Sequence, residues 1–272
     1  MKIFYICSLI ALAPFSYSQA SDAAVVETKP LQVVPVTSSD QLERAEVRIV
    51  FPQEEAVKHD ESLNVQVRSR NFSLGIPTDI DRKKEILNHE EGQMIRVSID
   101  NEPFFELGRS SLVTALRDIE DNRDDQLEKN ISSPLSEGAH LIRAYAVCSF
   151  GESLKNKEAF NSSIFYYKDK SNKVNISLND PYLTYNEPTG RFKVGAPILL
   201  DFLISNVVLS EDGYKIHLKI DDQHERWLSQ YTPYYIYGLP KGDHKISISL
   251  VDHLKQPVNK KLCHVTRMIT ID

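Results

Sequence analysis

Apolar and polar side chains alternate along most of the chain after Ala45. Segments 47–51 (VRIVF) and 62–74 (SLNVQVRSRNFSL) carry apolar residues at nearly every second position, which is the period of a β-strand with one face in water. Turn residues interrupt this alternation at intervals of about 8 to 15 residues, and no long segment keeps a helical period. The pattern predicts about six or seven short strands in each half of the chain, arranged as antiparallel sandwiches.

The two halves of the chain repeat one another. Residues 92–107 (GQMIRVSIDNEPFFEL) align with residues 213–228 (GYKIHLKIDDQHERWL), and each copy continues into a Leu-x-x-Gly-x-His unit that precedes an alternating strand. The expected fold is all-β, with two tandem antiparallel immunoglobulin-like β-sandwiches. We expect the first domain at 46–170 and the second at 171–272.

The first copy is longer than the second between two matched positions. Asp100 and His140 are 40 residues apart, whereas Asp221 and His244 are 23 apart. The additional residues lie in 110–130, where the spacing of leucines after two serines predicts a short helix that leads into an acidic loop. That loop lacks the turn glycine and the ligand register of a known calcium loop, so we interpret it as a solvated charged loop.

His140 and His244 are the repeated residues whose chemistry needs an explanation. Each begins a strand directly after a glycine turn, at the parity of the core-facing residues. An imidazole there can cap the end of a sandwich and hydrogen-bond turn backbone, whereas a metal role would need ligands that the first copy lacks. Asp100 and Asp221, which end the matching Ile-Asp strands, are interpreted as strand-terminating Asx turns. All four residues are therefore predicted to be structural.

The N-terminal residues have the pattern of an export signal. A lysine precedes an apolar stretch over 3–15, and Ser18 and Ala20 place small residues before a cut after Ala20. We expect a signal peptide at 1–20 and a flexible linker at 21–45, rich in small, polar and proline residues. The apolar stretch is too short to span a membrane, which predicts an exported protein, periplasmic or extracellular, with no membrane span in its mature chain.

Cys148 and Cys263 remain once the signal peptide is removed. In an oxidising compartment these two thiols could pair. They are 115 residues apart and fall in different predicted domains, so two half-buried thiols are the favoured interpretation.

Composition and motifs exclude several function classes. The formal net charge of −6 has no basic stripe to offset it, which disfavours nucleic acid and anionic membrane surfaces as partners. The chain has no nucleophile elbow, no His-Glu-x-x-His, no Cys-x-x-Cys and no glycine-rich phosphate loop. We therefore predict no catalytic residues, no cofactor and no metal, and a protein that is not an enzyme.

Several segments carry a resemblance to a known family. Residues 181–222 and 227–259 resemble a family of uncharacterised exported proteins of cyanobacteria and chlamydia-like bacteria, and the likeness extends to the first copy through 98–107, 135–147 and 151–160. The resemblance implies export and two tandem immunoglobulin-like domains, and it implies no activity. Relatives tend to carry His-Glu-Ser where this chain has Gly151-Glu152-Ser153, so any role of that histidine is absent here.

Three polar motifs, DNEP, ESLK and LTY, are predicted to lie in loops near the junction of the two domains. Such loops either bind a partner or hold the domains together. We favour the domain interface, because Leu199 and Leu203 are apolar on the face of their strand opposite Leu200, which indicates that both faces are covered. The candidate residues are Asp100, Asn101, Glu102, Pro103, Glu152, Ser153, Lys155, Tyr182 and Tyr185.

The sequence leaves three hypotheses for function. The preferred one is a binding or scaffolding protein of the periplasm or cell envelope, whose partner is an envelope protein or glycan. The second is a carbohydrate- or peptidoglycan-binding accessory module that uses exposed tyrosines such as Tyr182, Tyr185 or Tyr235. The third is a metal-handling protein of the second domain, with the ligands His244, His253, Cys263 and His264.

Overall fold

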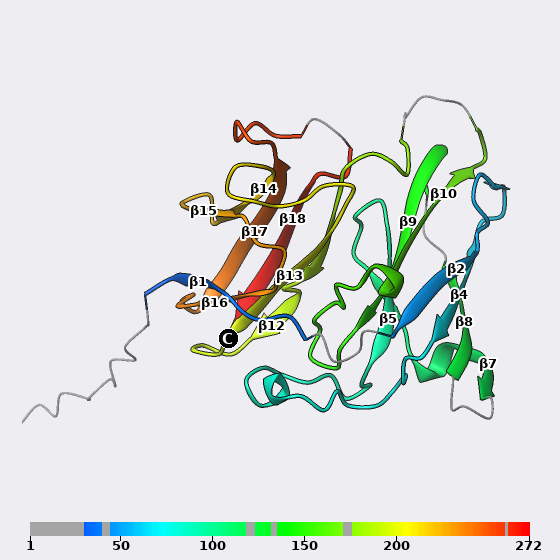
Figure 1. The fold of residues 1–272 in the computed structure, drawn as a ribbon, viewed down its shortest axis with the longest axis horizontal. Coiled ribbons are helices and arrows are strands. Elements are labelled where there is room, and N and C mark those ends of the chain that lie inside the picture. Colours follow the sequence, from blue (N-terminus) through cyan, green and yellow to red (C-terminus); the bar gives the residue numbers. More distant parts are fainter. Residues whose placement is uncertain (1–29, 40–43, 118–122, 132–134, 171–175, 259–260) are drawn as a thin grey trace, which may run out of the picture.

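The computed structural model describes residues 30–39, 44–117, 123–131, 135–170, 176–258 and 261–272. The regular structure of these residues is strand, apart from short 3-10 turns, which confirms the predicted all-β class. The strands form two sandwiches that stand side by side (Figure 1). The expected signal peptide at 1–20 lies outside the described residues.

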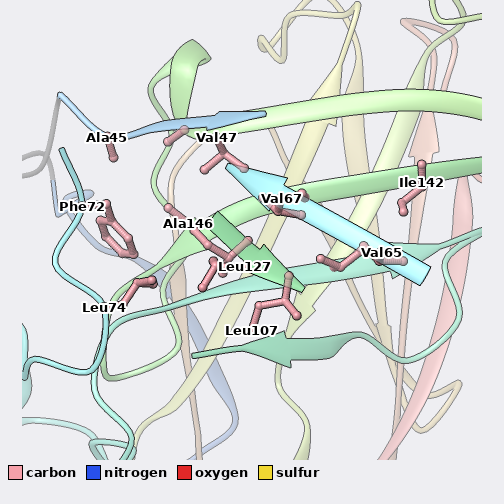
Figure 2. Close-up of a cluster of buried hydrophobic side chains, with 14 of the residues drawn as sticks. Ala45, Val47, Val65, Val67, Phe72, Leu74, Leu107, Leu127, Ile142 and Ala146 are labelled. Atoms are coloured by element: carbon pink, nitrogen blue, oxygen red, sulfur yellow. The ribbon is translucent and has the colours of Figure 1, made fainter. Parts of the chain in front are cut away.

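The first sandwich consists of two sheets around one core. One sheet has the strand order β2 (Glu46–Phe51), β4 (Leu63–Arg70), β8 (Arg123–Ile131) and β7 (Leu112–Arg117). The other has the order β3 (Val57–Lys58), β10 (Phe160–Tyr167), β9 (Gly138–Val147), β5 (Met94–Ile99) and β6 (Phe105–Leu107). Alternate side chains of β4 are buried, as its period-two sequence predicts. Figure 2 shows Val65, Val67 and Leu127 of the first sheet facing Leu107 and Ile142 of the second.

The second sandwich repeats this arrangement. One sheet has the order β1 (Gln32–Pro35), β16 (Tyr234–Tyr237), β13 (Ile198–Ser205) and β11 (Tyr182–Glu187). The other has the order β12 (Gly190–Phe192), β18 (His264–Ile271), β17 (Gly242–Val251), β14 (Lys215–Ile220) and β15 (His224–Leu228). The aligned segments of the two copies form matching strands, β5 with β14, β6 with β15 and β9 with β17. The internal repeat is therefore a repeat of structure.

The predicted helix after Ser110 is wrong. A 3-10 turn at Arg109–Ser111 leads into β7, which pairs with β8 as an antiparallel hairpin. The leucine spacing fits a helix, but Val113 and Thr114 are β-branched and the free edge of β8 offers hydrogen-bond partners to a whole strand. The longer insertion of the first copy thus supplies an edge strand that the second copy does not encode between β15 and β16.

That missing edge is completed by the N-terminal segment. β1 pairs antiparallel with β16 from Gln32 opposite Tyr237 to Pro35 opposite Tyr234. It occupies the position in the second sandwich that β7 occupies in the first. Leu31 and Val33 pack against the core of the second sandwich. The structure therefore places a strand inside the segment expected to be a flexible linker. Four residues are too few to show a period in the sequence.

The two sandwiches are stacked face to face, so the molecule has four layers. The β3-β10-β9-β5-β6 sheet of the first sandwich lies against the β1-β16-β13-β11 sheet of the second. The two remaining sheets form the outer layers. One face of the second sandwich, on β15, β14, β17 and β18, consequently points away from the first sandwich.

Candidate functional site

The repeated histidine and aspartate of the first copy form one hydrogen-bonded unit. His140 Nδ1 lies 2.7 Å from Asp100 Oδ2, and His140 Nε2 lies 2.7 Å from the carbonyl oxygen of Ser136. The other oxygen of Asp100 accepts the backbone N–H of Leu141 at 2.9 Å. The imidazole also stacks on Phe165, with 5.4 Å between ring centroids. The histidine thus bonds turn backbone, as expected, with both ring nitrogens in use.

The second copy builds the same unit from the matching residues. His244 contacts Asp221 Oδ2 at 2.7 Å and the carbonyl oxygen of Pro240 at 2.8 Å, and Asp221 Oδ1 accepts the Lys245 N–H at 2.8 Å. Each aspartate therefore joins the end of one strand to the start of its neighbour. The interpretation of these aspartates as local Asx turns missed this long-range contact. The duplicated geometry makes the unit a structural clasp.

The clasps favour the charged imidazole. Burial by itself lowers the pKa of His140, but hydrogen bonds to Asp100 and to the Ser136 carbonyl, together with the charge of Asp100, outweigh burial and raise that pKa. The pKa of His244 is raised in the same way by Asp221 and the Pro240 carbonyl. Burial would raise the pKa of Asp100, yet the bonds from His140 and Leu141 lower it.

We expect the protein to lose stability as the pH rises from about 6 toward 9. A histidine whose pKa is raised on folding contributes stability below its unfolded pKa, and this contribution disappears as the pH rises through the folded pKa. Urea unfolding at both pH values measures the difference. The double variant His140→Gln, His244→Gln keeps a polar side chain without titrating, so its stability should change less across this window. An unchanged pH dependence in that variant would contradict the assignment.

The two sandwiches meet through a contact that we call the seam, in which β5 and β9 of the first sandwich face β11 and β13 of the second. Met94, Tyr145 and Val147 contact Leu203 in a small apolar cluster. Charged and amide side chains from both domains are buried around it. Burying such groups is unfavourable unless each finds a partner, so the seam depends on matched pairs.

Asp201 on β13 is a fully enclosed charge of the seam, with no solvent exposure. Its Oδ1 accepts a bond from Lys155 Nζ at 2.7 Å. Its Oδ2 accepts bonds from the Ser153 N–H at 3.1 Å, the Ser153 hydroxyl, and Asn186 Nδ2 at 2.7 Å. Lys155 and Ser153 come from the first domain, so this carboxylate holds the two domains together.

Arg96 on β5 forms a second crossing point. Its guanidinium contacts Glu187 Oε1 at 2.7 Å and Asn186 Oδ1 at 2.8 Å across the seam, and Glu106 within its own sheet at 3.1 Å. Burial disfavours the charged guanidinium, but the carboxylates of Glu187 and Glu106 outweigh it and raise the pKa of Arg96. Gly151 has φ +87° and lies so close to Glu187 that a Cβ would be 3.1 Å from its carboxylate oxygen.

Arg143 on β9 forms a third crossing point. It donates to Thr184 Oγ1 at 2.6 Å and to the side-chain oxygen of Asn101. Asn101 Nδ2 in turn donates to the carbonyl oxygens of Leu183 at 2.9 Å and Leu262 at 3.2 Å. The DNEP turn of the first domain is thereby fixed to two segments of the second.

The residues after β1 run over the edge of the seam. Ser39 donates from its N–H and its hydroxyl to the two oxygens of Glu152, each at 2.7 Å. Arg82 also binds Glu152 and reaches the carbonyl oxygen of Thr37. Burial raises the pKa of Glu152, against the opposing charge of Arg82. Segment 36–39 therefore connects the strand added to the second domain with a buried carboxylate of the first.

Ser153, Lys155 and Asp201 place a hydroxyl, an amine and a carboxylate in contact, a combination that hydrolytic enzymes also use. Here Lys155 Nζ donates to three acceptors, Ser153 Oγ at 2.9 Å, Asp201 Oδ1 and the carbonyl oxygen of Phe202. Its three protons are thus all engaged, and Ser153 is buried. This arrangement suits an ion pair that joins two domains.

The sequence-predicted candidates occupy different places in the structure. Of the DNEP turn, Asn101 is buried in the seam, whereas Glu102 and Pro103 are exposed. Asp100 belongs to the histidine clasp. LTY lies on strand β11 and not in a loop. Its polar Thr184 can occupy a buried position of this strand because it accepts a hydrogen bond from the guanidinium of Arg143. The remaining candidates Glu152, Ser153 and Lys155 make the seam contacts already described.

The tyrosines expected to be exposed for glycan contact are buried. Tyr182, Tyr185 and Tyr235 have exposures of 2%, 5% and 3%. Their hydroxyls donate to the carbonyl oxygens of Ser177 and Pro188 and, for Tyr235, to Glu85 Oε2. A buried tyrosine satisfies its polar end in this way. These three rings are therefore not available to a ligand in this arrangement.

Three of the four proposed metal ligands, His244, Cys263 and His264, have other hydrogen-bond partners. His264 bonds Ser249 and Thr266, and the thiol of Cys263 donates to the carbonyl oxygen of Pro181. Within the described part of the chain, no group of three or more His, Cys, Asp or Glu residues gathers as a metal site. Cys148 and Cys263 are both buried free thiols, so the structure favours the unpaired interpretation.

The second sandwich presents a face that the sequence analysis did not single out. We call it the outer face; its two central rows of side chains run across β15, β14, β17 and β18. In the first row Trp227 lies opposite His217, His217 opposite Ser249, and Ser249 opposite His264. The second row, in the same strand order, consists of Glu225, Lys219, Ser247 and Thr266.

Trp227 lies at one end of the first row, on the edge strand β15. Its ring stacks on His217 with centroids 4.0 Å apart and planes 9° apart, and 36% of the residue is exposed. Glu225 accepts a bond from His217 at 3.2 Å and pairs with Lys219 at 2.8 Å. The sequence did contain a signal, because Trp227 has the parity of Glu225 and so of the solvent-facing positions of its strand.

Comparison with known proteins leaves both the family and the function of the chain open. No family model and no curated protein matches the chain. Solved structures that match include fibronectin(III)-like modules of Clostridium thermocellum CbhA, at 10% identity over 83% of this chain and 92% of theirs, with a TM-score of 0.25. The eight N-terminal Ig domains of Down Syndrome Cell Adhesion Molecule match at 8% identity over 84% and 28%, with a TM-score of 0.27.

A third match is the Bacteroides ovatus protein SGBP-B in complex with a mixed-linkage heptasaccharide. It has 16% identity over 84% of this chain and 47% of that one, with a TM-score of 0.18. At these identities and TM-scores, the likenesses do not say what this chain binds. Separately, no helix in the described parts of the chain is long and apolar enough to cross a membrane.

Proposed function

We propose that this chain is an exported, non-enzymatic binding or scaffolding protein of the periplasm or cell envelope. The observation that carries the proposal is the seam, where Asp201, Arg96 and Arg143 each join the two domains through buried hydrogen bonds. An interface of buried, hydrogen-bonded charges fixes one relative orientation, because moving either domain would leave a buried charge without its hydrogen-bond partners. Two sandwiches held in this way present fixed outer surfaces to a partner.

We propose that the protein is not an enzyme. The two groups of side chains that most resemble catalytic sites, the histidine clasps and the Ser153–Lys155–Asp201 contact, use their hydrogen-bonding groups within the protein. Export is supported by the signal pattern at 1–20 and by the resemblance to a family of exported bacterial proteins with two such domains. An envelope protein or an envelope glycan remains the expected partner.

A carbohydrate- or peptidoglycan-binding role is the second candidate function. The tyrosines first considered for it are buried, but the exposed Trp227 on the outer face favours it independently. Exposed aromatic rings are energetically useful in recognition because they bring a large contact area with little conformational freedom to lose.

We expect the exported protein to begin at Ser21 and to bind the envelope. The protein is purified from the exported fraction of bacterial cells, and its first residues are read by N-terminal sequencing. It is then mixed with purified peptidoglycan sacculi and, separately, with envelope membranes, and each mixture is sedimented. Co-sedimentation with one of them above that of an unrelated exported protein is expected. A protein retained in the cytoplasm, or one left in the supernatant by both preparations, would contradict the proposal.

A further inference from the structure

We infer that the outer face of the second sandwich is a binding site for a carbohydrate chain that stacks on Trp227. This inference rests on the proposed binding function and names its surface and its class of ligand. The first argument comes from the duplication. In the aligned copies, His217 and Trp227 stand where Arg96 and Glu106 stand, and Ser247 and Ser249 stand where Arg143 and Tyr145 stand.

In the first copy, this face is an interface. Arg96, Arg143 and Tyr145 are buried against the second domain. In the second copy the same positions face away from the other domain and carry a stacked indole, an imidazole and two hydroxyls. The same sheet face thus forms the domain interface in the first copy. In the second copy it carries different side chains, and none of the described residues of the first domain packs on it.

The indole is held in place before any ligand arrives. Its plane lies against His217, whose Nε2 contacts Glu225, and Glu225 is itself paired with Lys219. A chain of contacts over two strands therefore fixes the ring roughly parallel to its imidazole neighbour. Such preorganisation lowers the entropic cost of binding, because the aromatic side chain does not need to be ordered by the ligand.

The neighbouring side chains supply hydrogen-bonding groups on the same face of the sheet. Ser249 Oγ lies 2.6 Å from His264 Nδ1, and the exposed Thr266 has its Oγ1 2.8 Å from the Oγ of Ser247, which is itself only 7% exposed. Hydroxyls and imidazoles both donate and accept, so they can exchange these bonds for bonds to ligand hydroxyls. A row across four strands covers about 14 Å at the usual spacing of ~4.8 Å between strands, enough for a short oligosaccharide and not only for one sugar.

This combination fits a carbohydrate better than a protein partner. A sugar ring offers an apolar C–H face to an indole and a rim of hydroxyls to polar side chains. A protein interface of ordinary size would be expected to have a larger apolar centre. Two lysines on this side of the sheet are paired with neighbouring carboxylates, Lys219 with Glu225 and Lys245 with Asp222, so these charges are not free to attract a charged ligand.

Among the described residues, Lys255 is the neighbour that a stacking sugar would have to displace. Its ammonium lies 4.9 Å from the centroid of the Trp227 ring, and its side chain is exposed in a turn. An exposed cation–π contact is weak, about 0.5 to 1 kcal/mol, so displacement is not prohibitive. Lys255→Ala should therefore leave glycan binding unchanged or strengthen it.

The test uses the fact that Trp227 is the only tryptophan of the chain, so its fluorescence reports on this face alone. The exported protein is titrated with hexasaccharides of β-1,4-linked glucose, β-1,4-linked N-acetylglucosamine and α-1,4-linked glucose. A saturable change in tryptophan emission is expected with at least one of the three hexasaccharides. The hexasaccharide that causes it shows whether the site prefers a cell-wall-type amino sugar or a polymer of glucose. No saturable change with any of the three would overturn the inference.

Titration calorimetry with the sugar that gives a fluorescence change then measures the contribution of Trp227 to the affinity. Trp227→Ala should weaken binding by about tenfold or more, and Trp227→Phe should weaken it less. Arg226→Ala is the matched control, since Arg226 is exposed on the same strand at the opposite parity, and it should stay within about twofold. Equal urea midpoints show that the variants are folded.

Equal affinity of Trp227→Ala and the parent would reject the outer face as the site. If the parent co-sediments with the envelope and Trp227→Ala co-sediments equally well, the proposed function stands and only this inference fails. Failure of the parent itself to sediment would instead count against the proposed function.

Discussion

Replacing Asp201 with alanine is expected to lower the free energy of unfolding by about 3 to 5 kcal/mol, the usual result of removing one partner of a buried charge pair. The ammonium of Lys155 would lose its carboxylate, and the Asn186 amide and the Ser153 N–H and hydroxyl would lose their shared acceptor. Each unpartnered donor adds a desolvation cost. Urea unfolding followed by circular dichroism measures the change.

Asp243→Ala is the matched control, because Asp243 is an exposed aspartate of the same domain that bonds only a hydroxyl in the contacts described, that of Thr270. It should change the stability by less than about 0.5 kcal/mol. Because Asp201 joins two domains, Asp201→Ala should also make the two sandwiches more independent, which would broaden or split the transition. A loss of less than about 1 kcal/mol with a single sharp transition would show that the seam does not depend on this carboxylate.

Deleting residues 30–35 from the exported chain is expected to destabilise the second sandwich by about 2 to 4 kcal/mol. The deletion removes the backbone pairing of β1 with β16, at about 1 kcal/mol for each hydrogen bond, and uncovers the core where Leu31 and Val33 pack. Hydrogen exchange of β16 amides, read by mass spectrometry, should become faster. The first sandwich should keep most of its protection, because it has an edge strand of its own in β7.

A synthetic peptide of residues 30–36 should restore protection of β16 in the deletion variant in a concentration-dependent way. A pair of point variants provides the matched control. Val33 packs on the core, whereas Val34 is 40% exposed, so Val33→Asp should be clearly more destabilising than Val34→Asp. Unchanged exchange in the deletion variant, or equal effects of the two point variants, would contradict the role of β1.

The parts of the fold that depend on local pattern could be predicted from the sequence. Strands such as β4 and β17 carry a period of two along their own length, and the alignment of 92–107 with 213–228 reveals the duplication without any structure. The contact of His140 and His244 with turn backbone could also be anticipated from the glycine turn before each histidine. Each of these inferences uses residues that are close together in the chain.

The contacts that define the candidate site depend on residues far apart in the chain. Asp100 contacts His140 only because β5 and β9 are paired strands. In the sequence each residue stands beside a turn, so each was predicted to bond only its local turn. Thr184 is polar yet buried, because its partner Arg143 comes from the other domain. β1 becomes a strand only through the open edge of β16. No local pattern contains this information.

The pairing of β1 with β16 also has a consequence for the order in which the chain can fold. Every strand of the first sandwich lies between β1 and the rest of the second sandwich, so the first domain is in effect inserted into the second. As the chain emerges from a ribosome or a translocation pore, the first sandwich can close as soon as β10 appears. Residues 32–35 have no partner until Tyr234–Tyr237 follows about 200 residues later, and such late pairing of distant segments is slow. Residues 32–35 would therefore leave the pore before either sandwich and would be among the last residues to form their strand pairing.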